Sequence, residues 1–175
     1  MPPWFRIISG SAAGKTPVAT GLREVGLEPA AVRDVLLTHS HWDHTGGIRD
    51  LPNARIRMSK AELEFFAPLT RYIDHGAMPH LLTPALHRVR TFELEGPAVL
   101  RFESSHDLFG DGAIVAVPLP GHTPGSVGYL VRGRGGKRWL LSGDATWTVR
   151  GIELPAHKLA SVIDADAEQT SASIG

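Results

Sequence analysis

Apolar and polar positions in the first half of the chain follow the patterns of short strands and helices in turn. One helix is bounded by Pro17 in its first turn and by Gly26 just past its end. Another begins at Ser59, because Ser59 and Glu62 have the spacing of a capping box. The expected helices cover residues 17–25, 45–51 and 59–66, and the expected strands cover residues 4–8, 32–38 and 54–58.

The second half is rich in strand-like segments that glycine turns separate. Asp107 and Asp111, beside the glycines of residues 110–112, are typical turn formers. Residues 68–84 show no clear period and are a candidate lid over a site, whereas the tail from Leu159 onward predicts helix. Strands mixed with helices indicate a layered α/β protein. The expected strands in this half cover residues 89–94, 99–103, 113–117, 126–131 and 139–142.

Size and composition restrict the possible classes of protein. A chain of 175 residues with 42% hydrophobic residues can bury one sizeable core, so we expect one domain over residues 1–175. The 18 basic and 18 acidic residues balance, which favours neither nucleic acid nor an anionic membrane as a partner. The absence of cysteine excludes disulfides and thiolate metal ligands. No apolar run has bilayer length and the first residues do not resemble a secretory signal, so we expect a cytoplasmic location.

The strand expected over residues 32–38 is followed by four side chains that can bind metal, His39, His41, Asp43 and His44. Side chains two apart in an extended segment point the same way, so His39 and His41 can reach one ion. The chain must then turn, which lets Asp43 and His44 face a second ion beside the first. Imidazole and carboxylate ligands suit zinc, and also iron, manganese or cobalt.

The order His-x-His-x-Asp-His resembles the signature of the metallo-β-lactamase superfamily, and two later segments agree with it. Residues 118–126 resemble the family's Pro-Gly-His-Thr-Pro-Gly loop, which implies that His122 is a third histidine ligand. Residues 140–144 resemble the strand end that supplies a metal-bridging aspartate, here Asp144.

The resemblance extends from about residue 22 to about residue 147 and implies the family's αβ/βα sandwich, with metals at one edge of two sheets. It implies one or two zinc ions or similar first-row metals. By this resemblance one ion is held by His39, His41 and His122, the second is held partly by Asp43 and His44, and Asp144 bridges the two.

The chemistry of such a site predicts hydrolysis. A dication lowers the pKa of bound water from about 16 to about 7, so hydroxide is available at neutral pH. We therefore expect a metal-dependent hydrolase of a lactone or other ester, in which Asp43 both binds metal and passes a proton to the leaving group. Residues 107–112, before the histidine loop, are similar to family lactonases and related esterases. Thioester and phosphodiester substrates stay open.

The chain departs from the family pattern at both ends. After Asp144 only His157 follows, where the family has a later histidine that completes the second metal site, and the family's N-terminal hairpin turn is missing. The chain therefore looks shortened, which predicts an incomplete second site and self-association through exposed sheet edges. The alternative function is a noncatalytic metal-binding or assembly module left by truncation.

Some residues have two possible roles. Thr38 and Thr123 either orient imidazoles or only satisfy local backbone groups. Residues 9–16 resemble a phosphate-binding P-loop, but Gly10 falls one position late, so nucleotide binding is not expected. The other histidines are expected at surface or structural positions, namely His75, His80, His87, His106 and His157.

Overall fold

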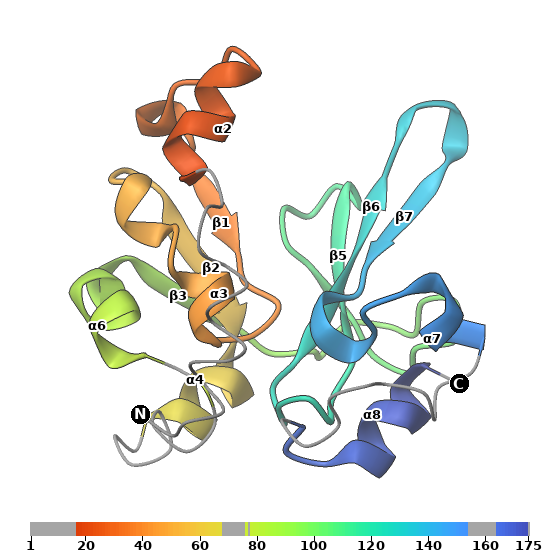
Figure 1. Cartoon of the computed structure of the whole chain (residues 1–175). Helices are drawn as coiled ribbons and strands as arrows, with labels where there is room; N and C mark the ends of the chain where they lie inside the picture. The colour runs from red at the N-terminus through yellow and green to blue at the C-terminus, as the bar shows by residue number, and fades with distance from the viewer. Residues whose placement is uncertain (1–16, 68–75, 77, 154–163, 175) are drawn as a thin grey trace.

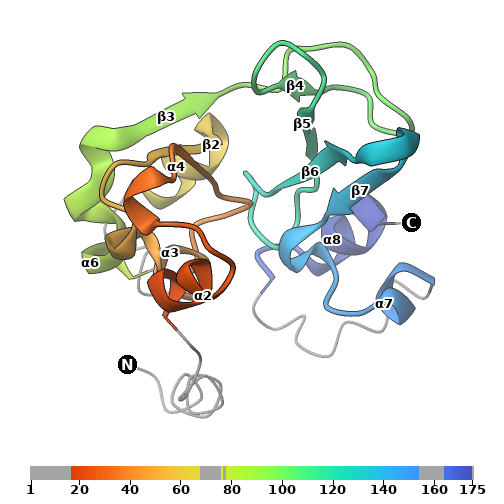
Figure 2. The ribbon, with the colours of Figure 1, turned by 90° about the horizontal axis from the view of Figure 1, so that it is seen from above.

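The computed structural model describes residues 17–67, 76, 78–153 and 164–174. Two β-sheets, each accompanied by helices, form the two halves of the molecule (Figures 1 and 2). The α/β fold predicted from the sequence is confirmed.

The first sheet is parallel, with the strand order β1-β2-β3. It consists of β1 (Asp34–Leu36), β2 (Arg55–Ser59) and β3 (Val89–Phe92), with Val35 of β1 opposite Ile56 of β2. Parallel strands need crossover connections, and helical segments supply them. The helical segments of this half are α2 (Val18–Glu24), η1 (Pro29–Ala31), α3 (Trp42–Thr45), η2 (Ile48–Asp50), α4 (Lys60–Phe66), α6 (Pro79–Leu82) and η3 (Thr83–Arg88).

Alternation along β2 separates a buried face from a polar face. Ile56 and Met58 are 0% exposed and pack with Leu82 in the core of this half. Arg57, between them in sequence, turns to the other face and its Nε donates to Asp34 Oδ1 over 2.7 Å. This alternation agrees with the strand expected over residues 54–58.

The second sheet is antiparallel, with the order β4-β5-β6-β7. Its strands are β4 (His106–Asp107), β5 (Ile114–Pro118), β6 (Val127–Arg132) and β7 (Arg138–Leu141). Asp107 makes the turn after β4, where its carboxylate accepts hydrogen bonds from the backbone N–H groups of Gly110 and Gly112. The helical segments of this half are η4 (Arg134–Gly136), η5 (Gly143–Ala145), α7 (Val149–Glu153) and α8 (Ala167–Ile174).

Residues of β6 join the two sheets. Tyr129 is 2% exposed, and its hydroxyl donates to the backbone oxygen of Leu37 over 2.7 Å. The N–H of Val127 donates to the backbone oxygen of Thr38 over 3.0 Å. Phe92 of β3 packs with both side chains in a second apolar cluster. The link therefore lies directly before the His-x-His segment.

One strand prediction is wrong. Over residues 99–103, Val99 and Phe102 form only an isolated bridge. Leu100 has a φ of 55°, a left-handed conformation that reverses the chain. This segment is therefore a turn rather than a strand.

The helices agree with the sequence in part. The helix expected over residues 17–25 is confirmed as α2, and the helix expected over residues 59–66 is confirmed as α4, with Ser59 as its N-cap. The helix expected over residues 45–51 is instead divided into α3, which begins earlier, and η2. Helix α6 and the start of η3 lie in the later part of residues 68–84, where no element was expected, and η3 continues to Arg88.

Some predictions lie outside the described residues, namely the first strand, the P-loop-like segment, His75 and His157. Within the described ranges, no helix has the length and apolar character needed to span a bilayer.

Replacing Tyr129 by phenylalanine tests the link between the sheets. Tyr129→Phe keeps the ring but removes the donor to Leu37, so we expect the free energy of unfolding to fall by about 1–2 kcal/mol. Urea denaturation of the metal-free protein measures this change. Val25→Ala, just after α2, is the control, because Val25 is 71% exposed and its replacement should change stability by less than about 0.5 kcal/mol. Equal stabilities of the two variants would contradict the role of this hydrogen bond.

Candidate metal centre

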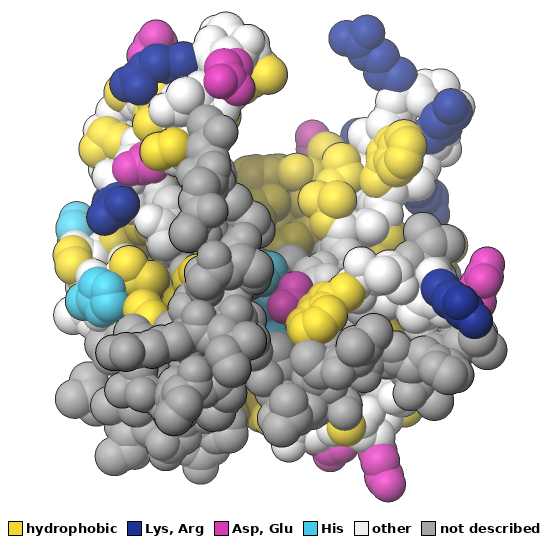
Figure 3. Space-filling view, in the orientation of Figure 1, with side chains coloured by type: hydrophobic (Ala, Val, Ile, Leu, Met, Phe, Trp, Pro, Cys, Tyr) yellow, Lys and Arg dark blue, Asp and Glu magenta, His cyan; other side chains and the backbone are white. Residues whose placement is uncertain are grey.

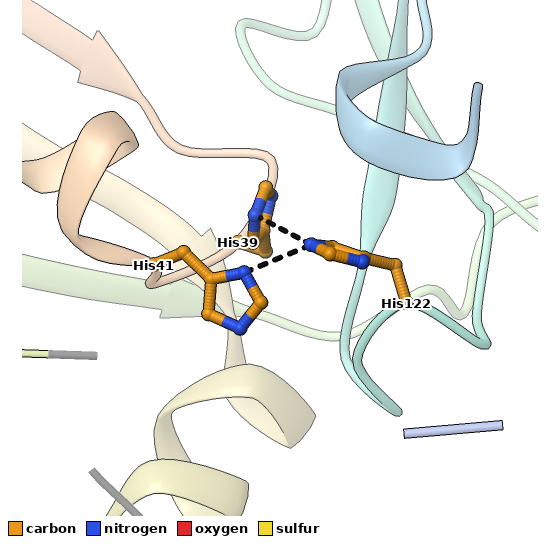
Figure 4. A group of neighbouring side chains, drawn as sticks. All are labelled: His39, His41 and His122. Carbon is orange, nitrogen blue, oxygen red and sulfur yellow. Dashed lines mark hydrogen bonds between the residues drawn. The ribbon is translucent and has the colours of Figure 1, made fainter. Parts of the chain in front are cut away.

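Three buried histidines converge between the two sheets (Figure 4). His39 and His41 follow β1, whereas His122 lies in the loop that follows β5. The Nε2 atom of His122 lies 3.2 Å from Nε2 of His39 and 2.8 Å from Nδ1 of His41. The three residues are 0%, 5% and 1% exposed in chain order. Segments distant in sequence thus direct one nitrogen each to a common point.

The donor set fits a zinc-type ion. Two nitrogens bound to one tetrahedral zinc at about 2.0–2.1 Å lie about 3.3 Å apart. The 3.2 Å and 2.8 Å separations between imidazole nitrogens approach that value. All three ligand atoms lie within 4.8 Å of one another, so a small displacement would let them surround one ion.

A second group of candidate ligands shares His39 with the first. It consists of His39, His44 and Asp144, with the ligand atoms again within 4.8 Å of one another. His44 comes from α3 and Asp144 from η5, so this group also joins the two halves. Histidine and acidic side chains accordingly meet between the halves near the centre of Figure 3.

Asp43 lies at the rim of this second group. Its Oδ2 is 3.6 Å from Nε2 of His44, and its side chain is 45% exposed. Asp144 Oδ1 is 3.4 Å from the same nitrogen, and its side chain is 20% exposed. The structure therefore brings together five predicted ligands closely and places Asp43 beside them, on the side open to solvent.

His44 and Asp144 each stabilise the charged form of the other. Burial, the largest influence on His44, opposes its protonation, but the hydrogen bond to Asp144 and the charge of Asp43 outweigh burial and raise the pKa of His44. Burial likewise disfavours the Asp144 carboxylate, but the hydrogen bond and charge of His44 prevail and lower its pKa to about 2. Asp144 is thus an anion at neutral pH, as a metal ligand must be.

Hydrogen bonds orient two of the imidazoles. Nδ1 of His122 lies 2.7 Å from Oδ1 of Asp164, whose side chain is 1% exposed. With the proton on Nδ1, the bond leaves the Nε2 lone pair directed at the cluster. Oγ1 of Thr38 lies 3.1 Å from Nδ1 of His39, which favours an orienting role for Thr38.

Thr123 instead donates a hydrogen bond to a buried carboxylate. Its hydroxyl donates to Oε2 of Glu62 over 2.5 Å, so it does not orient an imidazole. The N–H of Ser40 donates to Oε1 of the same residue over 2.7 Å. Burial raises the pKa of Glu62 to about 7, although the hydrogen bonds from Thr123 and Ser40 act in the opposite direction.

The segment before α8 forms backbone hydrogen bonds with the loop that carries His122. The N–H of Ala165 donates to the oxygen of His122 over 3.0 Å, and the N–H of Asp166 donates to the oxygen of Gly121 over 2.8 Å. Gly121 has a φ of 129°, and a Cβ there would lie 2.1 Å from the backbone nitrogen of Thr170. Only glycine allows this approach.

Sequence reasoning missed two residues of the site, Glu62 and Asp164. Glu62 was expected only as part of a capping box, and no motif includes Asp164. Among the other histidines, His80 and His87 are exposed, and His106 stacks on Phe92 with 4.9 Å between ring centroids. These three positions agree with the expected surface or structural roles.

Comparison with known proteins identifies the family. The model of the metallo-beta-lactamase superfamily matches residues 8–174, and the chain belongs to this superfamily. N-acyl homoserine lactonase AttM of Agrobacterium fabrum is 30% identical over 152 residues, which are 82% of this chain and 53% of the relative. The resemblance inferred from the sequence is confirmed.

Solved structures show the same fold. An N-acyl homoserine lactone hydrolase with the product N-hexanoyl-L-homoserine at its catalytic metal centre aligns with a TM-score of 0.67 at 22% identity, covering 90% of this chain and 54% of that one. The dizinc quorum-quenching lactonase AidC also aligns with a TM-score of 0.67, at 21% identity over 90% of this chain and 56% of that one. The chain thus spans about half the length of the relatives it matches.

Removing the carboxylate behind His122 tests the first ligand group. Asp164→Ala should weaken zinc binding about 10–100-fold, because the imidazole loses the partner that fixes its orientation. Competition with a chromophoric chelator measures the affinity. Glu168→Ala, at an exposed position of α8, should bind zinc like the unmodified protein. Unchanged affinity in a folded Asp164→Ala variant would refute this assignment.

Proposed function

We propose that this chain is a metal-dependent hydrolase that cleaves a lactone or another ester. The observation that carries the proposal is the pair of ligand groups that share His39, three imidazoles on one side and His44 with Asp144 on the other. This arrangement suits two ions side by side. Relatives described as N-acyl homoserine lactonases make N-acyl homoserine lactones the first substrates to test.

The buried and the exposed residues of the site would have different roles. When bound, divalent ions make a water acidic enough to supply hydroxide near neutral pH and polarise a carbonyl. The three-histidine group is buried, so a substrate would reach the site from the side of Asp43 and Asp144. Asp43 would assist binding of the second ion and carry a proton on its exposed carboxylate to the leaving alkoxide.

We further propose unequal occupancy of the two sites by zinc or a similar metal. The first group offers three buried nitrogens, whereas the second shares His39 and adds His44, Asp144 and the exposed Asp43. A group that shares one of its ligands and exposes the others to solvent holds an ion less firmly. The first ion would therefore bind more tightly than the second.

Replacing Asp43 tests the hydrolytic function. Asp43→Ala should reduce kcat/KM for N-acyl homoserine lactones or activated esters about 100-fold or more, since a ligand and a proton carrier are lost together. Chelation should abolish turnover by the unmodified protein, and added zinc should restore it. Asp50→Ala, outside both ligand groups, is the control and should retain activity.

The same assay separates the competing function. A protein that binds zinc but hydrolyses no lactone, ester or thioester would be a noncatalytic metal-binding module. Activity that survives both chelation and Asp43→Ala would exclude the proposed mechanism.

We also propose self-association through β7. This strand lies at the edge of its sheet among the described strands, and Trp139, Leu140 and Leu141 are 60%, 43% and 56% exposed. An unpaired apolar edge favours pairing with another strand, and a second copy gives the simplest closed arrangement.

A charge placed on β7 tests this association. Leu140→Lys should shift the protein toward monomer, because pairing would bring the lysine against apolar side chains. Light scattering over a concentration series measures the mass. Leu27→Lys is the control, since Leu27 is 53% exposed and lies outside both sheets, in the other half of the molecule. A monomer at every concentration of the unmodified chain would contradict the proposal.

A further inference from the structure

Glu62 is a fully buried carboxylate beside the metal centre but outside both ligand groups. It lies in the first turn of α4 and is 0% exposed. In the described part of the chain, no lysine or arginine forms an ion pair with it. Its two oxygens instead accept hydrogen bonds from the Ser40 N–H over 2.7 Å and from the Thr123 hydroxyl over 2.5 Å. Such donors offset the cost of burying a polar group.

The two donors belong to different halves of the metal centre. Ser40 separates two of the three converging histidines in the segment after β1. Thr123 directly follows His122, the third of them, in the loop after β5. One carboxylate therefore links the two loops that must approach each other for three imidazoles to meet.

The main chain fixes the position of this carboxylate. Oγ of Ser59 accepts a hydrogen bond from the Glu62 N–H over 3.1 Å and donates to the oxygen of Gly125 over 2.6 Å. A Cβ at Gly125 would lie 2.1 Å from the nitrogen of Glu62, so the start of α4 is in direct backbone contact with the histidine loop. The backbone of Glu62 is therefore held at a fixed position next to the loop that carries His122.

We propose that Glu62 is a positioning residue that sets the separation of His122 from His39 and His41, and with it the affinity and geometry of the metal centre. The inference rests on the metal centre of the proposed function and not on its substrate. Functional constellations tolerate displacements of only about 0.5 Å. Nitrogens 2.8 Å and 3.2 Å apart would be sensitive to any drift between the two loops.

Two substitutions separate positioning from charge. Glu62→Gln keeps the shape: its oxygen can accept from Ser40, and its amide can donate to the Thr123 hydroxyl. Thr123 can then donate to Oγ of Ser126, which lies 2.7 Å away. Glu62→Leu has a similar bulk but removes both hydrogen bonds. Positioning requires that glutamine preserve the site and that leucine impair it.

Titration with Co²⁺ provides the test, because its visible absorption reports ligand geometry independently of hydrolysis. We expect the unmodified protein and Glu62→Gln to bind with similar affinity and similar spectra. Glu62→Leu should bind about 10–100-fold more weakly, with an altered spectrum. Thr123→Val, which removes one of the two hydrogen bonds, should change both readouts in the same direction but less.

The control variant comes from the same helix, α4. Glu64→Leu replaces an exposed glutamate of α4 and should leave affinity and spectrum unchanged. The proposal would be overturned if folded Glu62→Leu and Thr123→Val bound Co²⁺ with the affinity and spectrum of the unmodified protein. If Glu62→Leu does not fold, the affinity and spectrum of Thr123→Val decide the question. Equal losses in Glu62→Gln and Glu62→Leu would assign the effect to charge and overturn positioning. No binding by the unmodified protein would refute the metal centre itself.

Discussion

The approach of His122 to the pair formed by His39 and His41 is the constraint on which the rest of the structure depends. These side chains come from two different sheets, so no single element can hold them together. Contacts between the halves therefore concentrate here: Val127 donates to the backbone of Thr38, and Tyr129 donates to Leu37. The fold brings the ligands together because it fixes one sheet against the other beside them.

Local patterns in the sequence were enough to predict most elements and the candidate ligand pair His39 and His41, whereas His122 was implied by the family resemblance. Alternation marked β2, and the Ser59 cap marked α4, since both depend on neighbouring residues. The turn that includes Leu100 and Phe102 was mistaken for a strand, because apolar residues occur both in strands and in turns that pack against the core. Their side chains instead line a cavity of about 460 Å³ with Leu119 and Leu140, a contact that only the tertiary fold creates.

The residues that support the ligands could not be predicted for the same reason. Glu62 lies 22 residues from Ser40 and 61 from Thr123, and Asp164 lies 42 residues from His122. A capping box would direct Glu62 back to the Ser59 backbone, but the adjacent ligand loops offer it other donors. Long-range donors thus override the local expectation, whereas the candidate ligands are identifiable because they lie in short motifs that resemble those of the family.

Deep burial explains why both supporting carboxylates need hydrogen-bond partners. Glu62 is 0% exposed, and the Asp164 side chain is 1% exposed. Carboxylates at such depth remain ionised only where donors or cations compensate them. Asp164 meets a ligand imidazole directly, and Glu62 meets residues adjoining the ligands. A dication among the imidazoles would place positive charge close to Asp164, in an interior where attraction is weakly screened. Asp164 would thereby both orient its imidazole and stabilise the ion, whereas Glu62, which meets only residues adjoining the candidate ligands, would act through their position.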